Sequence, residues 1–164
     1  MKKQIKKIEP LKEIAPLIAS VQLKDIRLVE ASVSTRIRSA REAGEVNLAI
    51  SKSADIKDYH MDDGILWVLA RFRMQLTPVE PGKDAAISVN AAFEIKYSFP
   101  KELKVSEGQL KTFAKIQGIF NAWPYWREFV QNMVARMNLP PITLSVFRLE
   151  DTAKIKRKNP VKPR

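Results

Sequence analysis

The chain has 164 residues, 45% of them hydrophobic, which is enough for one domain with a buried core. It has no cysteine, which excludes disulfides, thiolate metal sites and a cysteine nucleophile, and its single histidine, His60, excludes sites that need several imidazoles. No apolar run approaches the roughly 20 residues of a membrane-spanning helix, and the N-terminus lacks the clean apolar block of a signal peptide. We therefore expect a cytoplasmic protein with no membrane span.

The net charge of +11 suggests an anionic partner, but nearly all of it lies at the two ends of the chain. Residues 1–12 hold five lysines and one glutamate, residues 154–164 hold six basic residues and no acid, and the remaining residues carry a net charge of +1. We predict a basic N-terminal arm (1–14), a folded domain (15–150) and a basic, disordered tail (151–164). These ends carry no interleaved aromatic residues on which nucleic-acid bases could stack.

The first hundred residues predict four strands, at 18–33, 46–50, 65–76 and 87–99. In the first of them the apolar phase shifts at Lys24 and Asp25, which predicts a β-bulge or a bend. The fourth alternates apolar and polar residues throughout, as a half-buried antiparallel strand does. Between the second and third strands, residues 51–64 show no periodicity and many turn formers, which predicts a long connection.

The last third of the chain predicts two helices, at 106–120 and about 124–137. Ser106 is placed to cap the first, and Pro124 suits the first turn of the second, where a missing N–H costs nothing. The second helix carries an apolar stripe of period 3.6, formed by Trp126, Phe129, Val130, Met133, Val134 and Met137. Four strands followed by two helices, without alternation, predict an α+β fold with an antiparallel sheet and helices on one face.

The second helix also carries a recognisable motif. Its opening Trp-Pro-Tyr-Trp-Arg-Glu at 123–128, followed by Met-Val-Ala-Arg at 133–136, resembles the end of the SecB family of bacterial export chaperones. Lys-Asp-Ile at 24–26 is similar to a Lys-Asp-Ile motif in the first strand of that family, and the whole pattern covers residues 18–149. The resemblance implies four antiparallel strands with a long crossover between strands 2 and 3, placed here at 51–64, followed by two C-terminal helices.

Motifs for catalysis or metal binding are missing from the sequence. Asp55, Asp58, Asp62 and Asp63 form an acidic cluster near His60 that could hold a hard cation. They lack the fixed spacing of a calcium loop, so we expect a solvated acidic loop and not a cation site. There is no G-x-S-x-G motif and no phosphate-cradling glycine loop. We expect no enzymatic activity, no catalytic residue, no metal and no cofactor.

Aromatic residues gather around the junction of the two predicted helices. They cannot all point inward from so short a turn, so some should line a groove or an interface. The resemblance places Trp123, Tyr125 and Trp126 in a groove that takes extended, unfolded client segments, and it adds Tyr59 and Met61 by their position. The predicted client-binding residues are Tyr59, Met61, Phe113, Phe120, Trp123, Tyr125, Trp126 and Met137. The resemblance implies an ATP-independent holdase chaperone that could serve protein export.

The resemblance also implies protein partners. Family members assemble as tetramers, dimers of dimers, through strand edges and first helices, so Leu110, Ile116 and Ile119 are the expected contacts. They meet the translocase motor SecA through acidic residues on the flat sheet face, for which Asp25 and Glu30 are the candidates here. The C-terminal tail of this chain is basic, the opposite of what a basic motor element would need, which weighs against that contact.

Three alternatives stay open at this point. A SecB-like chaperone could serve a toxin–antitoxin pair or another dedicated client instead of general export. The basic ends could attach the protein to nucleic acid or to an anionic membrane through salt-dependent phosphate contacts. An α+β module could also bind a small apolar ligand between its sheet and its helices.

Overall fold

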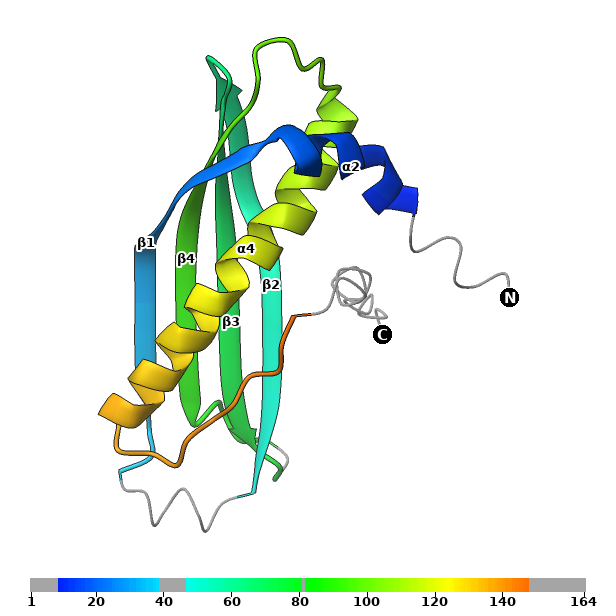
Figure 1. The fold of residues 1–164 in the computed structure, drawn as a ribbon. Helices are drawn as coiled ribbons and strands as arrows, with labels where there is room; N and C mark the ends of the chain where they lie inside the picture. The colour runs from blue at the N-terminus through cyan, green and yellow to red at the C-terminus, as the bar shows by residue number, and fades with distance from the viewer. Residues whose placement is uncertain (1–8, 39–46, 81, 148–164) are drawn as a thin grey trace.

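The computed structural model describes residues 9–38, 47–80 and 82–147; most of the predicted arm (1–14) and all of the predicted tail (151–164) lie outside them. In chain order the elements are α2 (Glu9–Ser20), β1 (Gln22–Thr35), β2 (Leu48–Asp62), β3 (Ile65–Pro78), β4 (Ile87–Ser98) and α4 (Glu107–Arg136) (Figure 1). The strands form one antiparallel sheet in the order β1-β4-β3-β2, which confirms the predicted fold class. The predicted bulge is confirmed as a register shift between Leu23 and Asp25.

Strands β2 and β3 form a hairpin, so the predicted crossover between them at 51–64 is wrong. β2 pairs with β3 along its whole length. The turn is Asp63-Gly64, whose φ angles of 42° and 72° are the positive values that a two-residue hairpin turn requires. The sequence hides this strand because β2 is an edge strand with polar side chains on its outer side. The crossover instead joins β1 to β2 at opposite sheet edges, and its residues 39–46 lie outside the described part.

The N-terminal helix α2 occupies the end of the predicted arm and the start of the predicted first strand. Ile14 and Leu17, three residues apart, are buried where α2 packs against α4. Strand β1 therefore begins at Gln22 and not at Ile18. Pro16 lies inside α2 and does not interrupt it.

One helix, α4, replaces the two predicted C-terminal helices. It begins with a capping box, which confirms Ser106 as the N-cap: the Ser106 hydroxyl accepts from the Gln109 N–H, and the Gln109 side chain accepts from the Ser106 N–H. The helix continues through Pro124, which lies on its exposed side. A proline there removes the N–H that would bind the Phe120 carbonyl, and water can bind this carbonyl on the exposed side. Burial of the opposite side holds the two halves in one helix.

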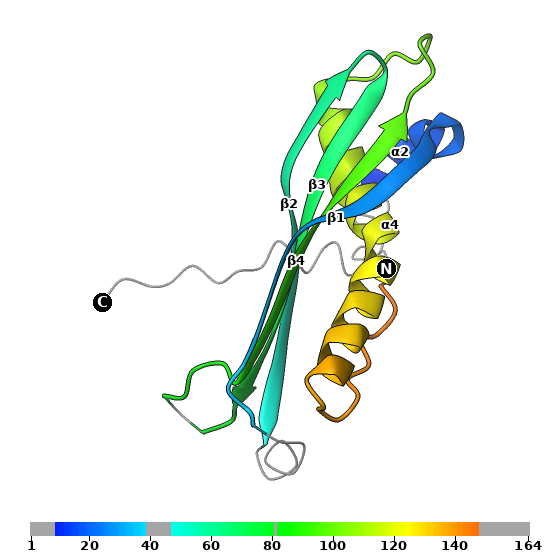
Figure 2. The same cartoon turned by 90° about the vertical axis from the view of Figure 1, so that its left-hand side faces the viewer.

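The core lies between α4 and the sheet. Every second residue of β3 and β4 is buried on the α4 side. The helix comes very close to the sheet at Gly118, where an added Cβ would lie 2.8 Å from Val68 Cγ1 and 3.2 Å from Ile56 Cδ1. Figure 2 shows the described helices on one side of the sheet only. The opposite side, called the outer face below, carries no helix within the described residues.

Candidate functional site

The aromatic residues of α4 divide into a buried and an exposed set. Phe113, Trp123 and Trp126 are buried, with 2%, 6% and 0% of their surface exposed. Because α4 is continuous, Trp123 and Trp126 lie on the same side of one helix. Both contact Phe72 of β3, at ring-centroid distances of 6.0 and 5.6 Å. The structure thus places these three predicted groove residues in the core.

Residues 139–147, the C-terminal strap, run back along the β2 side of α4 (Figure 1). Leu144 and Phe147 are buried, and the Phe147 ring lies 5.2 Å from that of Trp123. The Trp123 indole N–H donates to the Ser145 carbonyl at 3.0 Å. The β2 side of α4 therefore already holds a segment of non-helical polypeptide, through a hydrogen bond to its backbone and the burial of its apolar side chains.

The β1 side of α4 is open. The helix packs over β2, β3 and β4, whereas β1 is exposed along nearly its whole length. Tyr125 lies on this side, with its ring 6.5 Å from that of Phe93 on β4, and it is 46% exposed. Leu28 of β1 pairs with Phe93 in the register, so it lies on the same face, and Val33 follows it along β1. We call Leu28, Val33 and Tyr125, together with the buried Phe93 beside Leu28 and Tyr125, the open apolar face.

Exposed apolar side chains gathered in this way usually mark a binding surface. Strand β1 contributes Leu23, Leu28, Val29 and Val33 to the large apolar residues that are exposed. It is also an edge strand, whose unpaired backbone groups can pair with another chain. The sequence prediction does not include Leu28 or Val33 among the site residues. Alternation along β1 shows which residues share a face, but not that α4 leaves this face uncovered.

The other predicted client-binding residues lie apart from the open apolar face. Met61 and Phe120 are exposed, and Tyr59 and Met137 are half-buried. Tyr59 and Met61 belong to β2, at the opposite edge of the sheet from β1. The structure therefore does not bring the eight predicted residues together into one surface.

The predicted partner contacts also divide by burial. Ile116 and Ile119 are buried in the core of the chain, and Leu110 is half-buried against the same core. Asp25 and Glu30 are exposed on β1.

The outer face of the sheet mixes acids and bases. Asp55 of β2 pairs with Arg71 at 2.7 Å, and this hydrogen bond raises the pKa of Arg71. Arg27 and Glu94 form a second pair at 2.7 Å. The predicted acidic loop is thus part of strand β2 and its turn, and among the described residues no three His, Cys, Asp or Glu side chains meet as a metal-ion site.

Comparison with known proteins finds relatives among the SecB-like chaperones. No protein-family model matches the sequence. The chain is 25% identical over 146 residues to the SecB-like chaperone Rv1957 of Mycobacterium tuberculosis, an alignment that covers 81% of each protein. It is 27% identical, over the same length and coverage, to the SecB-like chaperone MT2006 of another strain of that organism.

A solved structure shares the fold. It is the Mycobacterium tuberculosis SecB-like chaperone Rv1957 in complex with a ChAD peptide from the Rv1956 HigA1 antitoxin, which matches with a TM-score of 0.70 and 22% identity over 84% of this chain and 97% of that one. The sheet and the long helix are thus those of a SecB-like fold. In sequence and in fold the chain is similar to the SecB-like chaperones, as a divergent relative. None of the described helices is long and apolar enough to cross a membrane.

Proposed function

We propose that this protein is a non-enzymatic, ATP-independent holdase that binds extended segments of unfolded polypeptide on the α4 side of its sheet. The observation that carries the proposal is the open apolar face, in which Tyr125 and Leu28 are each 46% exposed. It lies on the fold of a chaperone whose structure contains a bound peptide. Such a surface accepts many sequences because the burial of apolar area is non-directional.

The C-terminal strap supports the same proposal from the other side of α4. It is a segment without helix or strand structure, held by Trp123 and by the burial of Leu144 and Phe147. A client segment on the β1 side would meet similar chemistry, with an aromatic ring from α4 and apolar side chains from the sheet. The free edge of β1 adds backbone N–H and C=O groups that an extended client can pair with.

A dedicated client is the second candidate. The mycobacterial chaperone that shares this fold is bound to a peptide from an antitoxin, and we extend that class of client to this chain. Export through SecA has less support, because Arg27, Arg71 and Lys96 stand among the acids of the outer face. Assembly into a tetramer stays a prediction, for which the exposed edge of β1 offers a surface.

The test is light scattering of a chemically unfolded, aggregation-prone protein diluted into buffer with and without this chaperone. We expect suppression near stoichiometric amounts, and its loss in the double variant Leu28→Ser, Tyr125→Ser. Val79→Ser is the matched control, because Val79 is 65% exposed and lies outside the open apolar face. Circular dichroism checks that each variant is folded. No suppression at several-fold excess would contradict the proposal.

A further inference from the structure

The C-terminal strap packs against α4 through every second or third side chain. Leu139, Leu144 and Phe147 are buried and Ile142 is half-buried, whereas the strap residues between them are exposed. In Figure 1 the strap follows α4 back from its C-terminal end on the side of β2. It contacts Trp123 of α4 and Lys52 of β2, and we call the space that it fills between these two residues the strap groove.

Beyond its first residue the strap has few polar contacts. The Trp123 indole N–H donates to the Ser145 carbonyl at 3.0 Å, and the Lys52 ammonium donates to the Ser145 hydroxyl at 2.9 Å. No backbone-to-backbone hydrogen bond joins residues 140–147 to another described residue. A segment with so few backbone hydrogen bonds opens locally at a lower free energy than a central strand does. The strap can therefore leave α4 while the helix and the sheet stay folded.

Release of the strap would uncover Trp123, which is only 6% exposed beneath it. The Trp123 ring, 5.2 Å from that of Phe147, would then be free to pack against another apolar side chain. Its N–H would be free to donate to another backbone carbonyl, a group that every residue carries. The strap groove thus selects the spacing of apolar side chains along an extended segment and not a particular sequence.

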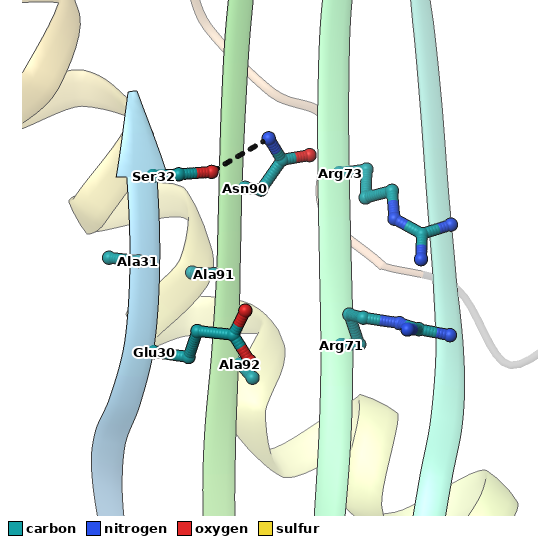
Figure 3. A pocket seen from close by; sticks show the side chains of 8 residues that line it. All are labelled: Glu30, Ala31, Ser32, Arg71, Arg73, Asn90, Ala91 and Ala92. Carbon is teal, nitrogen blue, oxygen red and sulfur yellow. Dashed lines mark hydrogen bonds between the residues drawn. The ribbon is translucent and has the colours of Figure 1, made fainter. Parts of the chain in front are cut away.

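The pocket on the outer face is unsuited to such a segment. It is built from β1, β3 and β4, and no apolar side chain larger than alanine lines it (Figure 3). In Figure 3 the Glu30 side chain extends toward Ala92, so a carboxylate lies at the hollow. An apolar side chain bound there would take this carboxylate out of water at a cost in free energy. A second apolar segment of a client therefore fits the α4 side of the sheet and not the outer face.

We propose that a client segment displaces the strap and takes its place in the strap groove, so that the strap is a built-in competitor of the client. This inference rests on the proposed function, because the client is first anchored at the open apolar face. Anchoring gives the rest of the client a high effective concentration, which offsets the advantage of the attached strap. A segment fits when a large aliphatic residue is followed three residues later by an aromatic one, as Leu144 is by Phe147.

The first measurement tests whether the strap groove takes a separate peptide. It compares full-length wild type with the double variant Leu144→Ser, Phe147→Ser, and it follows a labelled, capped copy of residues 139–147 by fluorescence anisotropy. We expect the variant to bind the peptide at least about tenfold more tightly, because the attached strap excludes the peptide from the wild type. A peptide with serine at the same two positions should bind neither protein. Equal binding of the unaltered peptide to both proteins, or none to either, would overturn the proposal.

The second measurement keeps the strap anchors intact. Val146 is 67% exposed, so Val146→Cys provides the chain's single cysteine for a nitroxide spin label without disturbing the packing. We expect a chemically unfolded client to increase the mobile component of the electron paramagnetic resonance spectrum until the protein is saturated. A label at Val79→Cys, away from the strap, is the control and should not change.

The two proposals fail in different ways. Failure of the holdase function shows as no suppression of light scattering by the wild type, whereas the peptide measurement contains no client and tests the strap groove by itself. Suppression of light scattering together with an unchanged spectrum at position 146 would overturn displacement of the strap and leave the proposed function standing.

Discussion

Trp126 of α4 stacks on Phe72 of β3, with ring centroids 5.6 Å apart and ring planes 21° from parallel, and neither side chain is exposed. This contact joins the long helix to the middle of the sheet. It sets the rotation of α4 about its axis, and hence which side of the helix each of its other aromatic side chains lies on. Tyr125, the preceding residue, is turned away from it toward Phe93 and the open edge.

Trp126→Ala should destabilise the protein by about 3–5 kcal/mol, the usual cost of removing a large aromatic side chain from a core. Trp126→Phe should cost less, because it keeps most of the ring contact and removes an indole N–H that is buried without a hydrogen-bond partner. Urea denaturation followed by circular dichroism measures both. Equal losses for the two variants would show that the stacked ring is not what stabilises this contact.

Gly118→Ala should destabilise the protein although alanine favours helices. Its Cβ would lie 2.8 Å from Val68 Cγ1, and overpacking of this kind costs about 1–3 kcal/mol. Gly108→Ala in the same helix is the matched control, since an added Cβ there meets nothing within 4 Å. It should stabilise the protein by up to about 1 kcal/mol, as expected from helix propensity alone. Thermal unfolding of both variants decides the matter, and a stabilised Gly118→Ala would contradict the close approach of α4 to β3.

Tyr97 should make the protein sensitive to alkaline pH. Burial raises the pKa of Tyr97 above its usual value of 10, against a smaller lowering by the hydrogen bond from Asn121. Because the folded-state pKa is the higher one, this contribution to stability is fully present below about pH 10 and is lost as the pH rises toward the folded-state pKa. Tyr97→Phe should remove this part of the loss, so its melting temperature should fall less between pH 9 and 11 than that of the wild type. Parallel pH profiles would refute this role.

The strap should be separable from the rest of the fold. Phe147→Ser removes the ring 5.2 Å from Trp123, so it should loosen the strap and shift tryptophan fluorescence toward the red as Trp123 becomes exposed. The loss of stability should stay below the roughly 3–5 kcal/mol of a central aromatic residue, because the strap lies at the border of the core. Val146→Ser is the neighbouring control, since Val146 is 67% exposed. An unchanged spectrum in Phe147→Ser would mean that the strap is held elsewhere.

The sequence predicts the elements whose residue types show directly which positions are buried and which cap a helix. In β4 the alternation is complete because one face is buried under α4 and the other is not. The cap at Ser106 is a local hydrogen-bond pattern that needs no tertiary information. Strand β2 is missed because it is an edge strand with polar side chains. Helix α4 is divided in two because Pro124 is typical of the start of a helix, whereas the burial that holds the helix together is a tertiary feature that the sequence does not show.

The candidate site is harder to predict for the same reason. Trp123, Tyr125 and Trp126 differ little as residue types, and only the phase of a continuous helix separates the buried pair from the exposed tyrosine. The exposure of Leu28 depends on where α4 crosses the sheet, which no local pattern in β1 encodes.

The most direct test of the central claim places a probe on the open apolar face. The chain has no cysteine, so Tyr125→Cys provides a single labelling site for an environment-sensitive fluorophore, and Val79→Cys provides a control outside the face. Titration with an unfolded client should give a saturable blue shift at position 125 and none at position 79, because the bound segment excludes water from the first probe only. No shift at position 125, or equal shifts at both positions, would contradict binding of polypeptide at this face.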